Sequence, residues 1–154
     1  SVLKGLDALN DKIILTATTN LYNSFDKALT RRFDVIIDFD RYKQEDLIDI
    51  GEAILNELLF KFKFAGRNMK LFRKILSLMN EIPYPGELKN LIKSSLAFSD
   101  PSNEYDYLKK IYLNTCGNGL NMDLKSLQDK GFTVREIEIL TGISKSQVSR
   151  ELKE

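Results

Sequence analysis

Two adjacent arginines, Arg31 and Arg32, are the residues of this sequence best placed to do chemistry. They lie in the stretch ALTRRFD, between a helix-forming segment and an apolar run that predicts a strand. Guanidinium groups stay charged at any physiological pH and repel one another. Two of them at the edge of a core are therefore either solvated surface charges or a site that an anion is meant to enter.

Composition excludes several other kinds of site. The 154 residues contain no His, which rules out His-based triads and His metal sites, and the single Cys116 can form neither an internal disulfide nor a zinc site. We therefore expect no metal site. The net charge of +1 supplies no overall attraction to nucleic acid or to a membrane. The apolar runs are shorter than the roughly 18 residues of a spanning helix, so we expect a cytoplasmic protein with no membrane partner.

Hydrophobic periodicity predicts two strands followed by many helices. Apolar and β-branched residues at 12–19 and at 35–39 predict buried strands, and a short helix expected at 23–30 is long enough to make them parallel. Further helices are expected from about residue 44, at 69–80, from Pro85 to about residue 98 and at 105–113, with a break at 116–119 and three short helices from residue 122. Because two buried strands cannot cover each other's faces, we expect a fragment of a larger α/β domain.

Three motifs in this order resemble the second region of homology and the lid of AAA+ ATPases. IILTATTN, at 13–20, resembles the apolar strand that ends in the sensor 1 Asn, and LKGLDAL, at 3–9, is similar to the helix before it. FDKALTRRFD, at 25–34, resembles the stretch that carries arginine before an aromatic residue and an acid. YPGELKNLI, at 84–92, looks like the lid motif that carries sensor 2. The resemblance covers about residues 1–100.

The resemblance implies roles for five residues. Asn20 would orient an attacking water beside a γ-phosphate, because an amide both donates and accepts. Arg31 and Arg32 would be fingers that reach the nucleotide of the next protomer. Gly86 and Lys89 would belong to the nucleotide-binding lid, with Lys89 standing where the family usually has arginine. ATP and Mg²⁺ would then be cofactors of a parent protein that forms a homo-oligomeric ring.

The phosphate-binding parts of such an enzyme are missing from this sequence. None of the eight glycines is followed by Lys, so there is no phosphate loop, or Walker A motif. VIIDFD, at 35–40, is like a Walker B strand, but in AAA+ order Walker B precedes sensor 1, so Asp38 and Asp40 are expected to be surface acids. We therefore expect this fragment alone to bind no cofactor and to be inactive as an ATPase.

The stretch FTVREIEILTGISKSQVSREL, at 132–152, resembles a helix-turn-helix. Thr133 and Glu136 have the spacing of a capping box, Gly142 suits the turn, and Ser144 can cap the second helix. The second helix carries a polar set suited to base edges and phosphates, namely Lys145, Ser146, Gln147, Ser149 and Arg150. Double-stranded DNA is therefore a candidate partner of the tail.

Two features of the tail leave a protein-docking or purely structural role open. Glu138 occupies a position that is usually small in this motif, and it would either crowd the helix crossing or point outward. Residues 122–154 contain six Lys or Arg and six Asp or Glu, whereas DNA-binding domains are usually more basic.

The sequence as a whole predicts a mainly α chain with four parts. These are the end of an AAA+ α/β core with two parallel strands (1–42), a helical lid (43–100), a linker helix and loop (101–121) and a helix-turn-helix (122–154). The expected function is that of the C-terminal part of an oligomeric AAA+ ATPase with a DNA-binding tail. The alternative is a non-enzymatic DNA-binding regulator whose first hundred residues form an oligomerisation scaffold.

Overall fold

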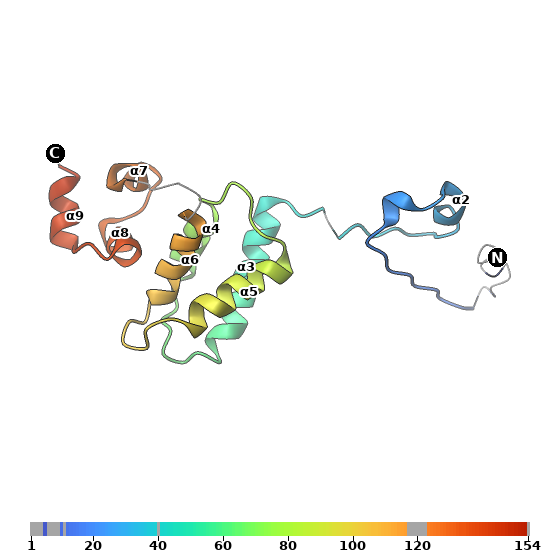
Figure 1. Ribbon diagram of the computed structural model, residues 1–154, viewed down its shortest axis with the longest axis horizontal. Coiled ribbons are helices and arrows are strands. Elements are labelled where there is room, and N and C mark those ends of the chain that lie inside the picture. Colours follow the sequence, from blue (N-terminus) through green and yellow to red (C-terminus); the bar gives the residue numbers. More distant parts are fainter. Residues whose placement is uncertain (1–4, 6–9, 11, 40, 117–122, 154) are drawn as a thin grey trace. The chain divides into compact units, whose positions relative to one another are not determined.

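The chain folds as two units in a computed structural model (Figure 1) that describes residues 5, 10, 12–39, 41–116 and 123–153. The first unit is Ser1–Arg41 and the second is Tyr42–Glu154. The boundary falls where the apolar pattern of the sequence changes to helical periodicity. The break predicted at 116–119 falls mainly on residues 117–122, which lie outside the described part.

The first unit has little regular structure in its described residues. A 3₁₀ turn, η1, spans Tyr22–Ser24, and a short helix, α2, spans Lys27–Thr30. The Asp26 side chain caps α2 by accepting a hydrogen bond of 3.0 Å from the Ala28 N–H. Phe25 between the two has extended backbone angles, so the single helix predicted at 23–30 is divided there.

The two strands predicted at residues 12–19 and 35–39 are wrong for this structure. Both segments lie within the described range 12–39, and neither is a strand. Their apolar side chains are not buried either: Ile14 is 94% exposed and Ile37 is 71% exposed. The reason is physical, because a strand needs a ladder partner for its N–H and C=O groups and a layer to cover its apolar face. Among the residues that the structure describes, neither segment has that partner or that layer.

The second unit is helical, so the predicted mainly α fold class is confirmed. Its helices are α3 (Gln44–Leu59), α4 (Met69–Leu76), α5 (Pro85–Ala97), α6 (Asp106–Cys116), α7 (Leu124–Asp129), α8 (Val134–Thr141) and α9 (Lys145–Glu151). In Figure 1, α3 to α6 form a bundle, and α8 lies against it through α6. No helix in the described part of the chain is both long and apolar enough to cross a membrane.

Local signals explain where these helices begin and end. Pro85 stands at the first turn of α5, as predicted, where its missing N–H is not needed. Asn68 begins α4 by accepting from the Leu71 N–H at 3.1 Å. The same helix ends at Leu76, earlier than predicted, and the Ser77 hydroxyl then donates to the Arg73 carbonyl.

One hydrophobic core runs through the whole second unit. Its members come from the bundle and from α7 to α9 alike, and the largest fully buried side chains are Tyr107, Phe72, Leu55, Leu71, Ile75, Leu76, Leu88, Ile92, Leu96, Leu108, Ile111 and Leu127. Gly51 lets α3 approach its neighbours closely, because a Cβ there would lie 3.0 Å from a Leu76 methyl and 3.1 Å from a Leu88 methyl. The predicted division of this unit into lid, linker and tail therefore has no matching break in the core.

The C-terminal helices form as the sequence predicted. Thr133 and Glu136 make both hydrogen bonds of a capping box at the start of α8. Gly142 ends that helix in the left-handed region, with φ of 78°, and Ser144 caps α9. Ile137, Leu140 and Val148, three of the five residues expected to pack α8 against α9, are fully buried, and the other two, Ile143 and Leu152, are half-buried.

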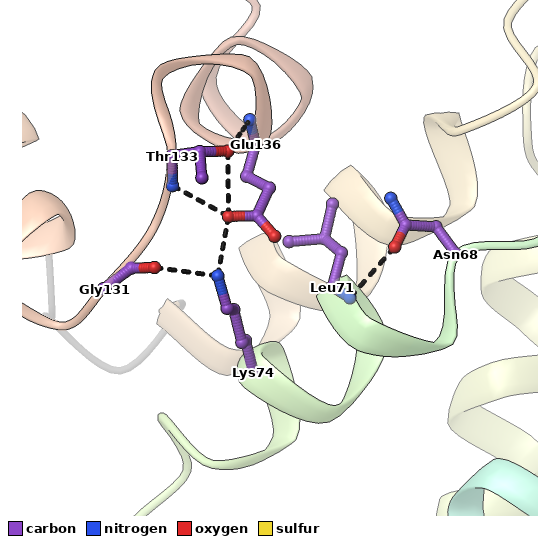
Figure 2. A network of polar contacts seen from close by, with 6 residues as sticks. All are labelled: Asn68, Leu71, Lys74, Gly131, Thr133 and Glu136. Atoms are coloured by element: carbon purple, nitrogen blue, oxygen red, sulfur yellow. Dashed lines mark hydrogen bonds and ion pairs between the residues drawn. The ribbon is translucent and has the colours of Figure 1, made fainter.

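The capping box is also the point at which α8 is tied to the bundle (Figure 2). Lys74, on α4, donates to a Glu136 carboxylate oxygen at 2.7 Å and to the Gly131 carbonyl at 2.7 Å. The same Glu136 oxygen accepts from the Thr133 N–H at 2.7 Å. The Lys74 and Glu136 side chains are only 23% and 12% exposed, so water screens this pair weakly.

The network also sets the charge state of Glu136. Burial alone would raise the pKa of this carboxyl, but the hydrogen bonds from Lys74 and Thr133 outweigh it and hold the pKa below its ordinary value. The ionised form of Glu136 therefore stabilises the folded chain.

We expect Lys74→Met to lower the free energy of unfolding by about 1–3 kcal/mol, because it leaves a partly buried carboxylate without its cation. The measurement is urea denaturation of the full chain followed by circular dichroism. Lys61→Met is the matched control: Lys61 is exposed just after α3 and pairs with Glu57 at 3.4 Å, and its loss should cost about 0.5 kcal/mol or less. Equal losses of stability in the two variants would contradict a stabilising role for the Lys74–Glu136 contact.

We also expect the stability difference between the wild type and Glu136→Gln to depend on pH. Because folding lowers the pKa of Glu136, its stabilising contribution is fully present above the ordinary glutamate pKa of about 4.3. That contribution is lost as the pH falls through the lower folded value. Unfolding curves at pH 7 and at progressively lower pH should therefore converge for the two proteins. A difference that stays constant down to acid pH would show that Glu136 is not held ionised by Lys74.

Candidate functional site

The arginine pair lies at the end of α2, in the first unit. Arg31 is the residue at which α2 ends, and its backbone N–H donates to the Lys27 carbonyl. Arg32 follows directly, and its guanidinium donates to the Ala28 carbonyl at 2.5 Å. Both side chains are exposed. The short helix therefore fixes the backbone under two cations whose charged groups reach solvent.

Asn20 lies in the same unit, directly before η1. It is exposed, and the neighbouring Thr19 hydroxyl accepts from the Leu21 N–H at 2.9 Å. This hydrogen bond forms a local turn directly before η1. The prediction that Asn20 ends a strand is wrong in the structure, since residues 12–19 are not a strand. Its role in orienting a water beside a γ-phosphate stays a prediction.

Gly86 and Lys89 lie in the first two turns of α5, in the second unit. Leu88 and Ile92 of this motif are fully buried in the bundle, and Leu91 packs against the core while partly buried. Lys89 is exposed, and Gly86 is exposed with nothing within 4 Å of the position that a Cβ would take. The motif thus has a core side and a polar side. The predicted roles of Gly86 and Lys89 in a nucleotide-binding lid stay predictions.

An open groove lies beside the start of α5, and sequence reasoning missed it. It has a volume of about 350 Å³ and is lined by Tyr42, Gln44, Leu47, Asn80, Glu81, Ile82 and Tyr84. The Tyr42 and Tyr84 rings are 6.2 Å apart between centroids and tilted by 57°. Gln44 donates to the Met79 carbonyl at 3.2 Å, which holds the start of α3 against the loop before α5. A flat apolar group with polar edges fits such a lining.

The polar residues predicted on the last helix lie on α9, mostly on its outer side. Lys145, Ser146, Gln147 and Arg150 are exposed, whereas Ser149 is half-buried beside the fully buried Val148. The Gln147 amide donates to the Glu151 carboxylate at 2.9 Å. This bond fixes the direction of the amide, although it also places an acid on the same helix face.

Glu138 neither crowds the helix crossing nor points away from it. Its carboxylate accepts a hydrogen bond of 2.9 Å from the backbone N–H of Lys145, the first residue of α9. The negative charge therefore stabilises the start of the following helix, where N–H groups lack partners within the helix. The acid that seemed out of place in the sequence fixes the geometry between α8 and α9.

A metal-binding site does not emerge from the described part of the chain. No group of three or more His, Cys, Asp or Glu side chains there is placed to hold a metal ion. Asp26 and Glu138 accept hydrogen bonds from the backbone at helix starts, and Glu136 pairs with Lys74.

Comparisons with known proteins add no relative to this picture. No protein-family model, no curated protein and no solved structure matches the chain. The case for any function therefore depends on the residues themselves.

Proposed function

We propose that this chain supplies sensor 1, the trans-acting arginines and the helical lid of an oligomeric AAA+ ATPase, and that its last helices bind double-stranded DNA. The order of the three motifs supports this proposal. The helical bundle follows the first two motifs and contains the third, which is what a lid requires, because a lid is a helical domain placed after the α/β core. ATP and Mg²⁺ would bind chiefly to a phosphate loop and a Walker B strand that this sequence lacks.

The arrangement of α5 is the single observation that carries the proposal. Leu88 and Ile92 are fully buried while Lys89, between them in the motif, is exposed. A sensor 2 residue needs this arrangement, since the lid core must hold the helix while one cation reaches a phosphate. Lysine presents a point charge in place of the bidentate fork of arginine, so its contact with phosphate is less directional.

The groove at the start of α5 gives further support for nucleotide binding. Tyr42 and Tyr84 offer ring surface, and Asn80 and Gln44 offer polar groups, within one concavity. A purine base has two apolar faces and hydrogen-bonding edges, which is the chemistry that such a lining accepts. Gly86 comes two residues after Tyr84 of this groove and has open space around the position that a Cβ would take.

The chemistry asked of the arginines is electrostatic. Phosphoryl transfer spreads charge over the equatorial oxygens of the transferred group, and a fixed cation stabilises that charge. Arg31 and Arg32 are held by the end of α2, and two adjacent guanidinium groups concentrate positive charge at one place on the surface. Asn20 would orient the attacking water from the same unit.

A second candidate function is that of a DNA-binding regulator without ATPase activity. The shared core of the bundle and α7 to α9 favours it, because a single rigid body could present α9 without any nucleotide. The two candidates differ in one observable. An ATPase requires a phosphate loop and a Walker B strand in the same assembly, and a regulator requires neither.

In the proposed ATPase subunit, we expect Arg31→Ala or Arg32→Ala to lower ATP turnover by roughly 10³-fold or more, the loss typical of an arginine finger. Nucleotide affinity should change far less, because the arginines act mainly on the transition state of a neighbouring protomer. Steady-state turnover and nucleotide titration measure the two quantities separately.

Arg41→Ala is the matched control for this experiment. Arg41 is an exposed cation of the same unit and pairs with Asp38 at 3.0 Å, so its loss removes a charge but no proposed finger. Turnover at the wild-type rate in both arginine variants and in the double variant would show that Arg31 and Arg32 are surface charges without a role in hydrolysis.

For the tail, we expect the full chain to bind duplex DNA weakly and to lose affinity as salt increases, because α9 offers few cations. Arg150→Ala combined with Gln147→Ala should weaken that binding, since both side chains are exposed on α9. The measurement is fluorescence anisotropy of a labelled duplex at two salt concentrations. An oligomeric form should bind far more tightly, because several copies raise the effective concentration.

Lys61→Ala serves as the control, since Lys61 is exposed and pairs with Glu57 at the end of α3. Absence of binding at low salt, even for an oligomer, would remove DNA as the partner of the tail. Binding that the double variant leaves unchanged would remove α9 as the contact surface.

A further inference from the structure

A lysine of the bundle reaches the turn that precedes α9. Lys109 lies on α6, and its ammonium nitrogen would lie 2.9 Å from a Cβ built on Gly142. Gly142 is exposed and adopts φ of 78°, which only a residue without a Cβ adopts freely. The absent Cβ therefore leaves room for the ammonium group beside this turn.

The charge of Lys109 is not used within the described part of the protein. Lys109 is half-exposed, and no ion pair engages it there, whereas its neighbour Lys110 pairs with Asp106 at 3.4 Å. The nearby carboxylate of Glu138 is engaged with the Lys145 N–H. An available cation thus lies at the same turn from which the exposed residues of α9 begin.

We infer that Lys109 contacts a backbone phosphate of duplex DNA beside the docking position of α9, so that bundle and tail form one composite binding surface. This inference rests on the proposed DNA binding of α9. Charge indicates the partner. The backbone of duplex DNA carries regularly spaced phosphates, and three cations from two elements, Lys109, Lys145 and Arg150, can each contact one of them. The Lys74–Glu136 contact holds α8 on the bundle and so helps to keep Lys109 and the cations of α9 at a fixed distance from one another.

A purely structural role for Lys109 makes a different prediction. Its ammonium lies at the C-terminal end of α8, where a cation is favoured by the partial negative charge of the helix end. Loss of that interaction would lower the stability of the chain without changing the number of DNA phosphates that the protein neutralises. The salt dependence of binding separates the two roles, since each phosphate contact adds about 0.9 to the slope of log K against log salt.

The test is anisotropy titration of a labelled duplex with the full chain at several salt concentrations between roughly 50 and 200 mM. Lys109→Ala should weaken binding on the order of tenfold at the lowest salt and reduce the slope by about 0.9. Lys109→Arg should keep the wild-type slope, because it keeps the charge. Lys110→Ala should match the wild type, because Lys110 is on the same helix and already paired with Asp106.

The outcomes separate the inference from the proposed function. If the wild type binds and Arg150→Ala weakens binding while Lys109→Ala keeps the full slope, α9 binds DNA and the role of Lys109 is overturned. Equal slope changes in the Lys109 and Lys110 variants, or weaker binding with an unchanged slope, overturn it as well. If the wild type binds no duplex at the lowest salt, both the proposed function of α9 and this inference fail.

Discussion

The ion pair between Lys74 and Glu136 is the contact on which the arrangement of the second unit depends. Glu136 caps α8 through Thr133 and, with the same oxygen, binds a lysine of α4, so the residue that caps the start of α8 also links that start to the bundle. Because both side chains are largely buried, removing one partner would leave the other charge poorly solvated and would destabilise the fold. The packing of α6 against α8 then extends the bundle core into the last three helices.

The features predicted correctly from the sequence are those that a few neighbouring residues determine. Pro85 at the first turn of α5, the capping box of Thr133 and Glu136, and Gly142 in the left-handed region each depend on atoms within one or two helical turns. The apolar pattern also located the residues that pack α8 and α9 together, because one face of each helix must be apolar to pack. Helix caps and turns of this kind can be predicted from the sequence without knowledge of the fold.

The features that the sequence did not reveal need partners far apart in the chain. Lys74 and Glu136 are 62 residues apart, and Gln44 reaches the Met79 carbonyl across 35 residues. The pairing of Tyr42 with Tyr84 and the approach of Lys109 to Gly142 are of the same kind. The two predicted strands failed for a related reason. An apolar, β-branched pattern states a preference, whereas a strand forms only when another segment completes its hydrogen bonds.

The balanced charge of the tail illustrates why a count along the chain is a poor guide to a surface. Residues 122–154 contain equal numbers of acidic and basic side chains, but Glu136 is neutralised by Lys74, which lies outside that range. Glu138 is directed at the backbone of α9, and Lys109 contributes a cation from α6. The charges around the turn before α9 are therefore not given by the sum over the segment. Whether a helix faces an anion depends on which charges remain unpaired on its exposed side, and that is a property of the fold.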